Sequence, residues 1–447
     1  MTRLIATVSL ILLFCGASLQ KQQPGTAPTA AGTAQTEADE YTRYELLAAE
    51  TAIPGTPSGT QTASFKILYE VTATTPGARV YYNPIRKGST ASDEAVYDVM
   101  TGEALRFEVV SGAAARKDPL MPDADLAGNY IKVQLARAVP AEGQGRIVIV
   151  KTYKDAKSYY REGDAIVFNR SLGIRRNKVV LPAGFELVSC NVPSQVLPEA
   201  DGRIAVSFMN AGAEEAHLIL RAKPGVQTGP SAAPHPATQK RSWEAPFEGE
   251  TEKERLSERA HQDRDIVYFL QQPETHAFSL YHDYTESRPG MDKYLNVVRE
   301  GSTVSEPSAY VLDTGEKLAT RLITGTELAA TKTTSEEPVK PTTQVVVIGF
   351  PAVKKGQSVR LRISETYTAP ASYRLDGDEL VFDRSLGRPR NAVVLPAGWY
   401  LTASTIPATV TQLPDGRIRL DFWNGRPDSV DVLVKARRRV SPAEPGH

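Results

Sequence analysis

Cysteine is scarce in this chain of 447 residues, and neither sign of charge is in excess. Only Cys15 and Cys190 are present, which excludes a disulfide framework as the main source of stability. Lys and Arg number 52 against 52 Asp and Glu, a balance that gives no general attraction for nucleic acid or anionic membranes. No apolar run reaches the roughly 20 residues of a transmembrane helix. We therefore expect neither a nucleic-acid partner nor a transmembrane span.

The motifs of the common catalytic sites are also missing. The sequence has no G-x-S-x-G nucleophile elbow, no phosphate-binding G-x-x-x-x-G-K loop, no C-x-x-C pair and no H-E-x-x-H zinc motif. These absences lower the expectation of an enzyme without excluding one. No residue is predicted to be catalytic or cofactor-binding, and no cofactor is predicted.

The N-terminus has the three-part layout of a secretory signal peptide, which we assign to residues 1–18. A basic residue precedes the apolar run Leu4–Cys15, and small residues follow it. The alternative is a buried N-terminal strand. The end of the run resembles a bacterial lipobox except at Phe14, where that motif has a small residue, so Cys15 is a candidate lipid anchor. This layout predicts an exported protein of the periplasm or cell envelope, or a secreted one.

Two stretches of low apolar content predict flexible connections. Residues 19–43 and 223–265 are rich in Pro, Gly, Thr and Ala and cannot bury enough surface to offset the entropy of ordering. The end of the second linker, residues 252–264, is charged and predicts a short exposed helix. Residues 437–447 are assigned to a C-terminal tail.

An internal duplication is the strongest signal in the sequence. Residues 157–222 and 371–436 align without a gap at an offset of 214, and the residues upstream align at an offset of 213. Both copies of the central block read Val-Phe-Asn/Asp-Arg-Ser-Leu-Gly. Two copies are too few for a solenoid, so the chain is predicted to consist of two related halves, 44–222 and 266–436.

The repeated unit has the alternation typical of β-strands. Arg417–Phe422 and its counterpart Arg203–Phe208 alternate polar and apolar residues after an Asp-Gly turn. Gln344–Phe350 is apolar on both faces, which favours a central strand. Short strands without amphipathic helices predict an all-β fold, a tandem duplication of antiparallel β-sandwich-like units. Each half is long enough for two subdomains, with seams near residues 155 and 369.

The block from Tyr373 to Trp399, with GDELVFDRSLGRPRN at its centre, resembles one found in exported bacterial proteins that have tandem β units and no known activity. The resemblance covers most of the second half and, more weakly, the first. It implies no activity and no functional residues. The strand Arg360–Tyr367 also resembles the noncatalytic β domain in front of some zinc aminopeptidases, but the zinc-binding motif is absent.

A polar corner occurs in the central block of both halves. Its members are Asn169, Arg170, Ser171 and Asn177 in the first half and Asp383, Arg384, Ser385 and Asn391 in the second. A carboxylate beside a guanidinium suggests acid-base chemistry, but the first copy replaces Asp by Asn and so lacks the proton carrier. We therefore predict a structural corner that caps turns and backbone, with Arg170 and Arg384 each holding several acceptors.

Two further groups of residues carry weak signals for metal ions. The first group lies in one loop and consists of Asp118, Asp123, Asp125 and Asn129. These residues offer the oxygen ligands that calcium uses, but the EF-hand spacing is absent, and the alternative is a solvated acidic loop. His276 and His282 flank a strand-like pattern that would place them roughly 20 Å apart, too far to share one ion.

The leading functional hypothesis is a noncatalytic exported envelope protein, whose paired β units provide a binding or structural surface for an envelope protein or a glycan. Aromatic pairs such as Trp399-Tyr400 are the hint of a sugar-stacking surface, with core packing as the alternative. The competing hypothesis is an enzyme, or an enzyme accessory, acting on peptide or polysaccharide at a cleft between the halves. An active site should use groups that only one half has, whereas a scaffold should repeat its groups in both.

Overall fold

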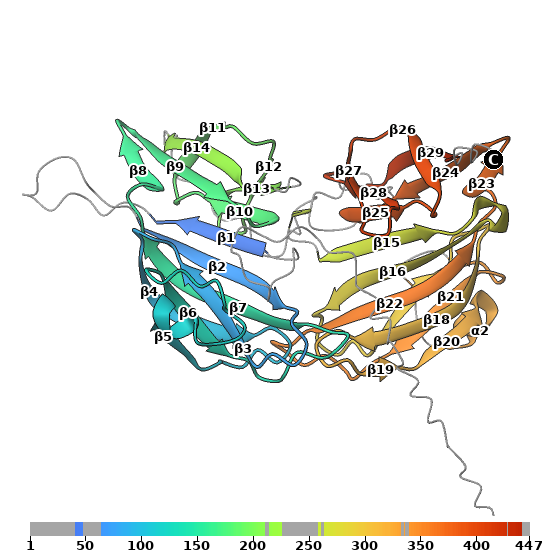
Figure 1. Ribbon diagram of the computed structural model, residues 1–447, viewed down its shortest axis with the longest axis horizontal. Coiled ribbons are helices and arrows are strands. Elements are labelled where there is room, and N and C mark those ends of the chain that lie inside the picture. The colour runs from blue at the N-terminus through green and yellow to red at the C-terminus, as the bar shows by residue number, and fades with distance from the viewer. Residues whose placement is uncertain are drawn as a thin grey trace, which may run out of the picture.

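The computed structural model describes residues 41–47, 64–210, 214–225, 258–260, 263–331, 335, 339–426 and 428–439. Their regular structure is almost entirely β-strand, which confirms the predicted all-β fold with repeated sandwich-like units. Figure 1 shows the two halves side by side, the first in blue to green and the second in yellow to red. The predicted signal peptide with Cys15, and most of both predicted linkers, lie outside the described residues.

Strands β1 to β14 build the first half. Their bounds are Tyr41–Leu46 (β1), Ser64–Ala73 (β2), Val80–Ile85 (β3), Thr90–Asp98 (β4), Phe107–Ser111 (β5), Asn129–Gln134 (β6), Gly145–Lys154 (β7), Tyr159–Glu162 (β8), Ala165–Leu172 (β9), Arg176–Val180 (β10), Phe185–Cys190 (β11), Gln195–Pro198 (β12), Ile204–Met209 (β13) and Ala216–Pro224 (β14). One short helix, α1 (Gly112–Ala115), follows β5.

Strands β15 to β29 build the second half and, apart from β19, repeat the first in order. Their bounds are Arg264–Leu270 (β15), Ala277–Glu286 (β16), Lys293–Val297 (β17), Thr303–Val311 (β18), Lys317–Leu318 (β19), Thr320–Thr324 (β20), Gln344–Gly349 (β21), Val359–Thr368 (β22), Tyr373–Asp376 (β23), Glu379–Leu386 (β24), Arg390–Val394 (β25), Trp399–Ser404 (β26), Ala408–Gln412 (β27), Ile418–Trp423 (β28) and Val430–Arg438 (β29). A 3-10 turn (Pro273–Thr275) precedes β16, and helix α2 (Gly325–Ala330) follows β20.

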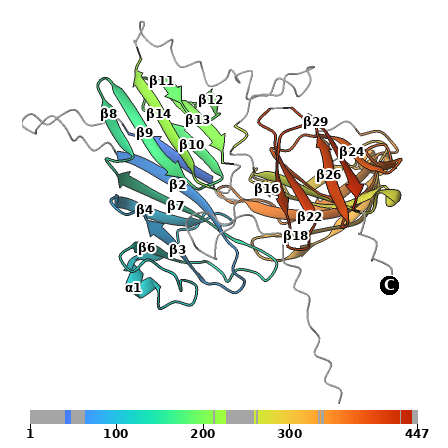
Figure 2. The same ribbon diagram turned by 45° about the horizontal axis from the view of Figure 1, so that its top comes forward.

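Both halves have the same layered topology, which Figure 2 shows from a second direction. The large sheet has the order β12-β13-β10-β1-β2-β7-β4 in the first half and β19-β18-β22-β16-β15-β25-β28-β27 in the second. A three-stranded sheet (β3-β6-β5 or β17-β21-β20) and a four-stranded sheet (β11-β14-β9-β8 or β23-β24-β29-β26) complete each half. Strand β21 lies between β17 and β20, which confirms the predicted central strand.

Pairing departs from the antiparallel prediction at one place in each half. β1 runs parallel to β10 and antiparallel to β2, and β15 runs parallel to β25 and antiparallel to β16. The large sheet therefore continues past the seams predicted near residues 155 and 369, and in each half one large apolar cluster includes residues from both sides of the seam, beside smaller clusters. Tyr44 and Leu46 of β1 lie in that cluster, so burying β1 between the two groups of strands stabilises the joined sheet.

Some boundaries differ by a few residues from the prediction. β1 begins at Tyr41, inside the predicted first linker, because the Tyr41 side chain is buried and its backbone pairs on both sides. β15 begins at Arg264, and β29 ends at Arg438 inside the predicted tail. Within the helix predicted over residues 252–264, the described residues 259–260 lie in a turn.

Candidate functional site

The residues of the repeated corner lie in strands and face different sides. Arg170 in β9 and Arg384 in β24 are buried, while the residues before and after each of them face outward, because side chains alternate along a strand. The hydroxyl of Ser171 contacts Nδ1 of His217 at 3.1 Å, and Ser385 donates to a carboxylate at the matching place. The outward residues are therefore paired across the sheet, away from the arginines.

Asn177 and Asn391 cap the backbone in the same way in both halves. Nδ2 of Asn177 donates to the carbonyl oxygen of Ile174 at 2.7 Å, and Nδ2 of Asn391 donates to that of Arg388 at 2.7 Å. Both asparagines are buried at the start of a strand of the large sheet. Each amide thus satisfies a carbonyl where the chain enters β10 or β25.

Arg170 is held by a carboxylate from the connection between β7 and β8. Its Nη1 donates to Oδ2 of Asp155 at 3.1 Å and lies 3.0 Å from Oγ of Ser158. Oδ2 of Asp155 also accepts from the hydroxyls of Ser158 at 2.7 Å and Ser89 at 3.2 Å. Burial raises the pKa of Asp155, but the hydrogen bonds and the Arg170 charge outweigh it and hold this pKa below its usual value.

An aromatic cage surrounds the arginine in both halves. In the first half the ring centroids of Tyr44, Phe65 and Tyr153 lie 5.9, 5.6 and 5.8 Å from Cζ of Arg170. In the second half those of Tyr268, Phe278 and Tyr367 lie 5.8, 5.3 and 5.9 Å from Cζ of Arg384. Guanidinium groups are attracted to aromatic faces at these distances. The two cages are built from equivalent positions of the duplication.

The carboxylate that holds Arg170 has no counterpart in the second half. Ala369 occupies the position of Asp155, and the local backbone is unchanged. Tyr159 N donates to Asp155 O at 2.9 Å, and Tyr373 N donates to Ala369 O at 2.8 Å. Nε and Nη1 of Arg384 are buried and have no hydrogen-bond partner within the part of the chain that the structure describes.

A second buried polar group lies beside the cage of the first half. Nζ of Lys151 donates to Oδ1 of Asn83 at 2.5 Å and lies 4.9 Å from the centroid of the Tyr153 ring. Lys151 is 4% exposed. Burial, assisted by the positive charge of Arg170, lowers the pKa of the Lys151 amine to about 7.

The second half has the opposite charge at this position. Glu365 replaces Lys151, and Nδ2 of Asn296 donates to its two carboxylate oxygens at 2.9 and 2.8 Å. Burial raises the pKa of Glu365, and hydrogen bonds from Asn296 and Tyr367 partly oppose that rise. An asparagine amide accepts a hydrogen bond through its oxygen and donates through its nitrogen. It can therefore pair with the lysine of the first half and with the glutamate of the second.

The two halves meet at a buried ion pair. Nε and Nη2 of Arg146 donate to Oδ1 and Oδ2 of Asp313, each at 2.6 Å, and the two residues are 6% and 0% exposed. Oδ2 of Asp313 also accepts from the backbone N of Arg360 at 3.2 Å. A bidentate, charge-assisted pair out of water requires exact alignment of its groups. This pair therefore fixes the halves relative to each other.

Hydrogen bonds across this junction join positions that are related by the duplication. Gln144 N donates to Leu312 O at 2.8 Å, and its counterpart Ser358 donates from Oγ to the carbonyl oxygen of Val99, the counterpart of Leu312, at 3.0 Å. Such reciprocal contacts resemble the interface of a symmetric dimer. The symmetry ends at Asp313, whose counterpart in the first half is Met100.

Two of the four predicted calcium ligands pair with side chains of the protein itself. Oδ2 of Asp118 accepts from a tyrosine hydroxyl at 2.8 Å, and Asp125 pairs with Lys87 at 2.6 Å. Asp123 is exposed, and Asn129 begins β6. Among the described residues, no three His, Cys, Asp or Glu side chains are grouped so that they could hold a metal ion.

The two histidines of the second half have separate environments. His276 ends the 3-10 turn, and its Nδ1 lies 3.0 Å from the carbonyl oxygen of Tyr373. His282 lies within β16 at 3% exposure, and burial together with the charge of Arg388 lowers its pKa to about 3. His282 is therefore neutral in the folded protein at neutral pH.

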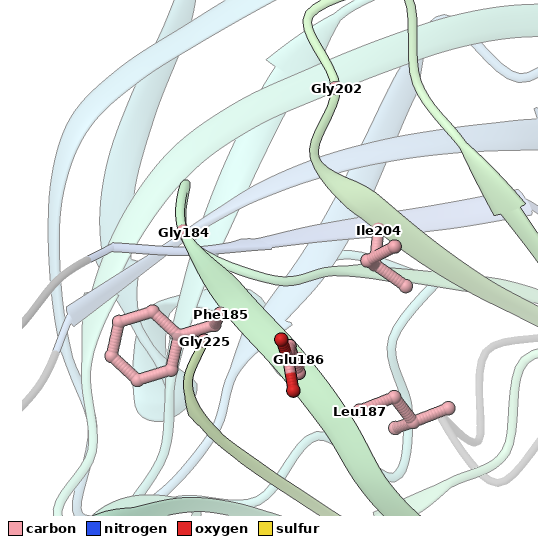
Figure 3. Close-up of a pocket in the computed structure, with 7 residues that line it drawn as sticks. All are labelled: Gly184, Phe185, Glu186, Leu187, Gly202, Ile204 and Gly225. Atoms are coloured by element: carbon pink, nitrogen blue, oxygen red, sulfur yellow. The ribbon is translucent and has the colours of Figure 1, made fainter. Parts of the chain in front are cut away.

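An open pocket of about 300 Å³ lies on the first half, between the start of β11 and the start of β13 (Figure 3). It is lined by Gly184, Phe185, Glu186, Leu187, Gly202, Ile204 and Gly225. In the second half, Trp399 takes the place of Phe185, is 1% exposed and donates from Nε1 to Gln272 at 3.0 Å. Trp399 is thus a core residue, and Glu186 is the one charged side chain that lines the pocket.

No protein-family model and no curated protein sequence matches this chain. Among solved structures, an M1 zinc metallopeptidase from Deinococcus radiodurans is similar over 39% of this chain and 41% of its own, at 15% identity and a TM-score of 0.25. An aminopeptidase N family protein from Idiomarina loihiensis is similar over 38% of this chain and 29% of its own, at 13% identity and a TM-score of 0.23. Likenesses of this size carry no argument about function.

The described helices are all short. None of them has both the length and the apolar content needed to cross a membrane.

Proposed function

We propose that this chain is a noncatalytic protein of the cell envelope that acts as a rigid two-part scaffold and binds a partner protein along repeated strand edges. The sequence layout of residues 1–18 supports export. The buried Arg146–Asp313 pair supports rigidity, because it holds the halves in one arrangement.

The observation that carries the proposal is that exposed apolar residues recur at equivalent edge positions. Val196 in β12 is 46% exposed, and its counterpart Val410 in β27 is 50% exposed. Val109 in β5 and its counterpart Leu322 in β20 are 54% and 43% exposed. All four strands lie at the end of a sheet. Unpaired strand edges with apolar side chains accept an added strand from another protein.

Site-specific photo-crosslinking in the producing cells tests this function. A crosslinking residue at position 196 and, in a separate variant, at position 410 is expected to capture the same partner protein. Leu126 is the matched control, because it is 57% exposed and apolar but lies in a turn outside the strands. Different partners at 196 and 410, or the same adduct from 126, would contradict the proposal.

Mass spectrometry of the mature protein tests the envelope location. We expect loss of about the first 17 residues, as a signal-peptide layout requires. Added lipid on Cys15 would identify an anchored form. An intact Met1 in the mature pool would refute export.

A further inference from the structure

We propose that the second half binds one small monovalent anion at Arg384, where the first half has the carboxylate of Asp155. This site is independent of the strand edges proposed above. The proposal rests on the duplication. At the equivalent place in the first half, the negative charge beside the arginine is part of the chain itself, the carboxylate of Asp155.

The surroundings of the site match closely between the halves. Asn169 N donates to Ser158 O at 2.8 Å, and Asp383 N donates to Ser372 O at 2.7 Å. The turn before β4 is likewise repeated before β18, since Ser89 N donates to Arg86 O and Ser302 N donates to Arg299 O, each at 3.1 Å. Ser302 and Ser372 are therefore the counterparts of Ser89 and Ser158, the two hydroxyls that donate to Asp155.

The guanidinium of Arg384 supplies the charge for the site. Arg384 is 8% exposed, and its Nε and Nη1 have no hydrogen-bond partner among the described residues. A buried donor without an acceptor costs free energy, and a charged one costs more. Ala369 offers no acceptor on its side chain. The oxygens of Glu365 accept from Asn296, whose Nδ2 lies 2.9 and 2.8 Å away.

The size of the missing group sets the class of ligand. Replacing Asp by Ala removes one carboxylate, so the site suits formate or chloride and is too small for sulfate or a larger carboxylate. The ligand would accept hydrogen bonds from a guanidinium and two hydroxyls, as Asp155 does. Ser302 and Ser372 are both half-buried, which leaves a way in from solvent.

Thermal melts of the full-length chain test the site. Sodium formate, sodium chloride and the bulky sodium gluconate are compared at one ionic strength, so that screening of the other ion pairs stays constant. We expect formate or chloride to raise Tm by about 2 to 4 °C over gluconate in a saturable way. The arm that saturates identifies which of the two small anions binds.

Two substitutions in the full chain provide the decisive comparison. Ala369→Asp supplies the carboxylate covalently and is expected to abolish the dependence on small anions. Asp155→Ala gives the first half the arrangement of the second and is expected to add a second anion-dependent rise. Equal Tm in all three salts, or a dependence that persists unchanged in Ala369→Asp, would overturn the proposal.

Discussion

The aromatic cages of the two halves hold the same arginine among different charges. The first half combines Arg170 with Lys151 and Asp155, and the second combines Arg384 with Glu365 and Ala369. The backbone and the three rings stay the same, while the charged neighbours change sign or disappear. The comparison shows that the cage and its arginine belong to the architecture of the unit, whereas the counter-charge is free to vary.

The junction between the halves shows the same kind of difference: equivalent positions make contacts there, but their charges differ. Equivalent carbonyl groups of the two halves accept hydrogen bonds across the junction, but the ion pair occurs once, because Asp313 of the second half binds Arg146, whereas Met100 of the first half has no charge to offer Arg360. The single pair therefore distinguishes the two halves at an otherwise symmetric contact.

The largest expected effect is at this pair. Asp313→Ala leaves the Arg146 guanidinium buried and unpaired, which should lower the free energy of unfolding by about 3 to 5 kcal/mol. Urea denaturation of the full chain measures it. The double variant Arg146→Met with Asp313→Leu should recover most of the loss, because it removes both charges. A loss below about 1 kcal/mol for Asp313→Ala would show that the pair does not hold the halves together.

The next effect compares the two caged arginines. Arg170→Ala removes ring contacts and leaves the carboxylate of Asp155 without its cation. We therefore expect the free energy of unfolding to fall by about 2 to 3 kcal/mol. Arg384→Ala removes ring contacts and leaves no carboxylate without its cation, so we expect a loss of about 1 kcal/mol. Thermal melts in gluconate compare them, with exposed Asp383→Ala as the control. A larger loss at Arg384 than at Arg170 would reverse this assignment.

Opposite pH dependences should separate the two charged neighbours. The pKa of Lys151 falls from 10.5 to about 7 on folding, so the unfolded chain binds more protons between these values and stability rises with pH there. The pKa of Glu365 rises above 4.5 on folding, so its contribution to stability falls as pH rises from 4.5 through the folded value.

Unfolding free energies measured against pH test both signs. Lys151→Met should lack a rise of up to about 1.4 kcal/mol per pH unit between pH 7 and 10, and Glu365→Gln should lack the fall that begins as pH rises above 4.5. Profiles of either variant that run parallel to the wild type would show that the group titrates alike in the folded and unfolded chains.

The smallest expected effect on stability is at Asn177 and Asn391, which make the same hydrogen bond in the two halves. Asn177→Ala and Asn391→Ala each remove a 2.7 Å hydrogen bond to a backbone carbonyl. We expect equal losses of about 1 kcal/mol in chemical denaturation. If the two losses of unfolding free energy differ by more than about 1 kcal/mol, the two hydrogen bonds contribute unequally to stability although their lengths are equal.

Local patterns predict much of the fold because they are local. Arg417–Phe422 and Gln344–Phe350 carry their strand signal in their own residues, and both are strands in the structure. The parallel pairing of β1 with β10 joins segments far apart in the chain, and no alternation within β1 reports it. The sequence of each segment predicts a strand, and their parallel pairing is seen only in the folded structure.

The residues near the two corner arginines could not be predicted from the sequence for a related reason. Arg170 and Arg384 are visible as repeated residues, but Asp155 lies just before the gapless alignment begins at residue 157. Comparing positions 155 and 369, and 151 and 365, would have exposed the exchanged charges. The contact of Asp155 with Arg170 still depends on segments that come together only in the folded half.

The position of β1 has a consequence for the order in which the chain is made. β1 is synthesised first in the first half, yet one of its edges pairs with β10, at residues 176–180. That edge has no partner until the ribosome has added all of the intervening strands, and long-range pairing of this kind is slow. A nascent or truncated chain that stops before Arg176 therefore exposes an open strand edge, which makes it a substrate for chaperones and prone to aggregation.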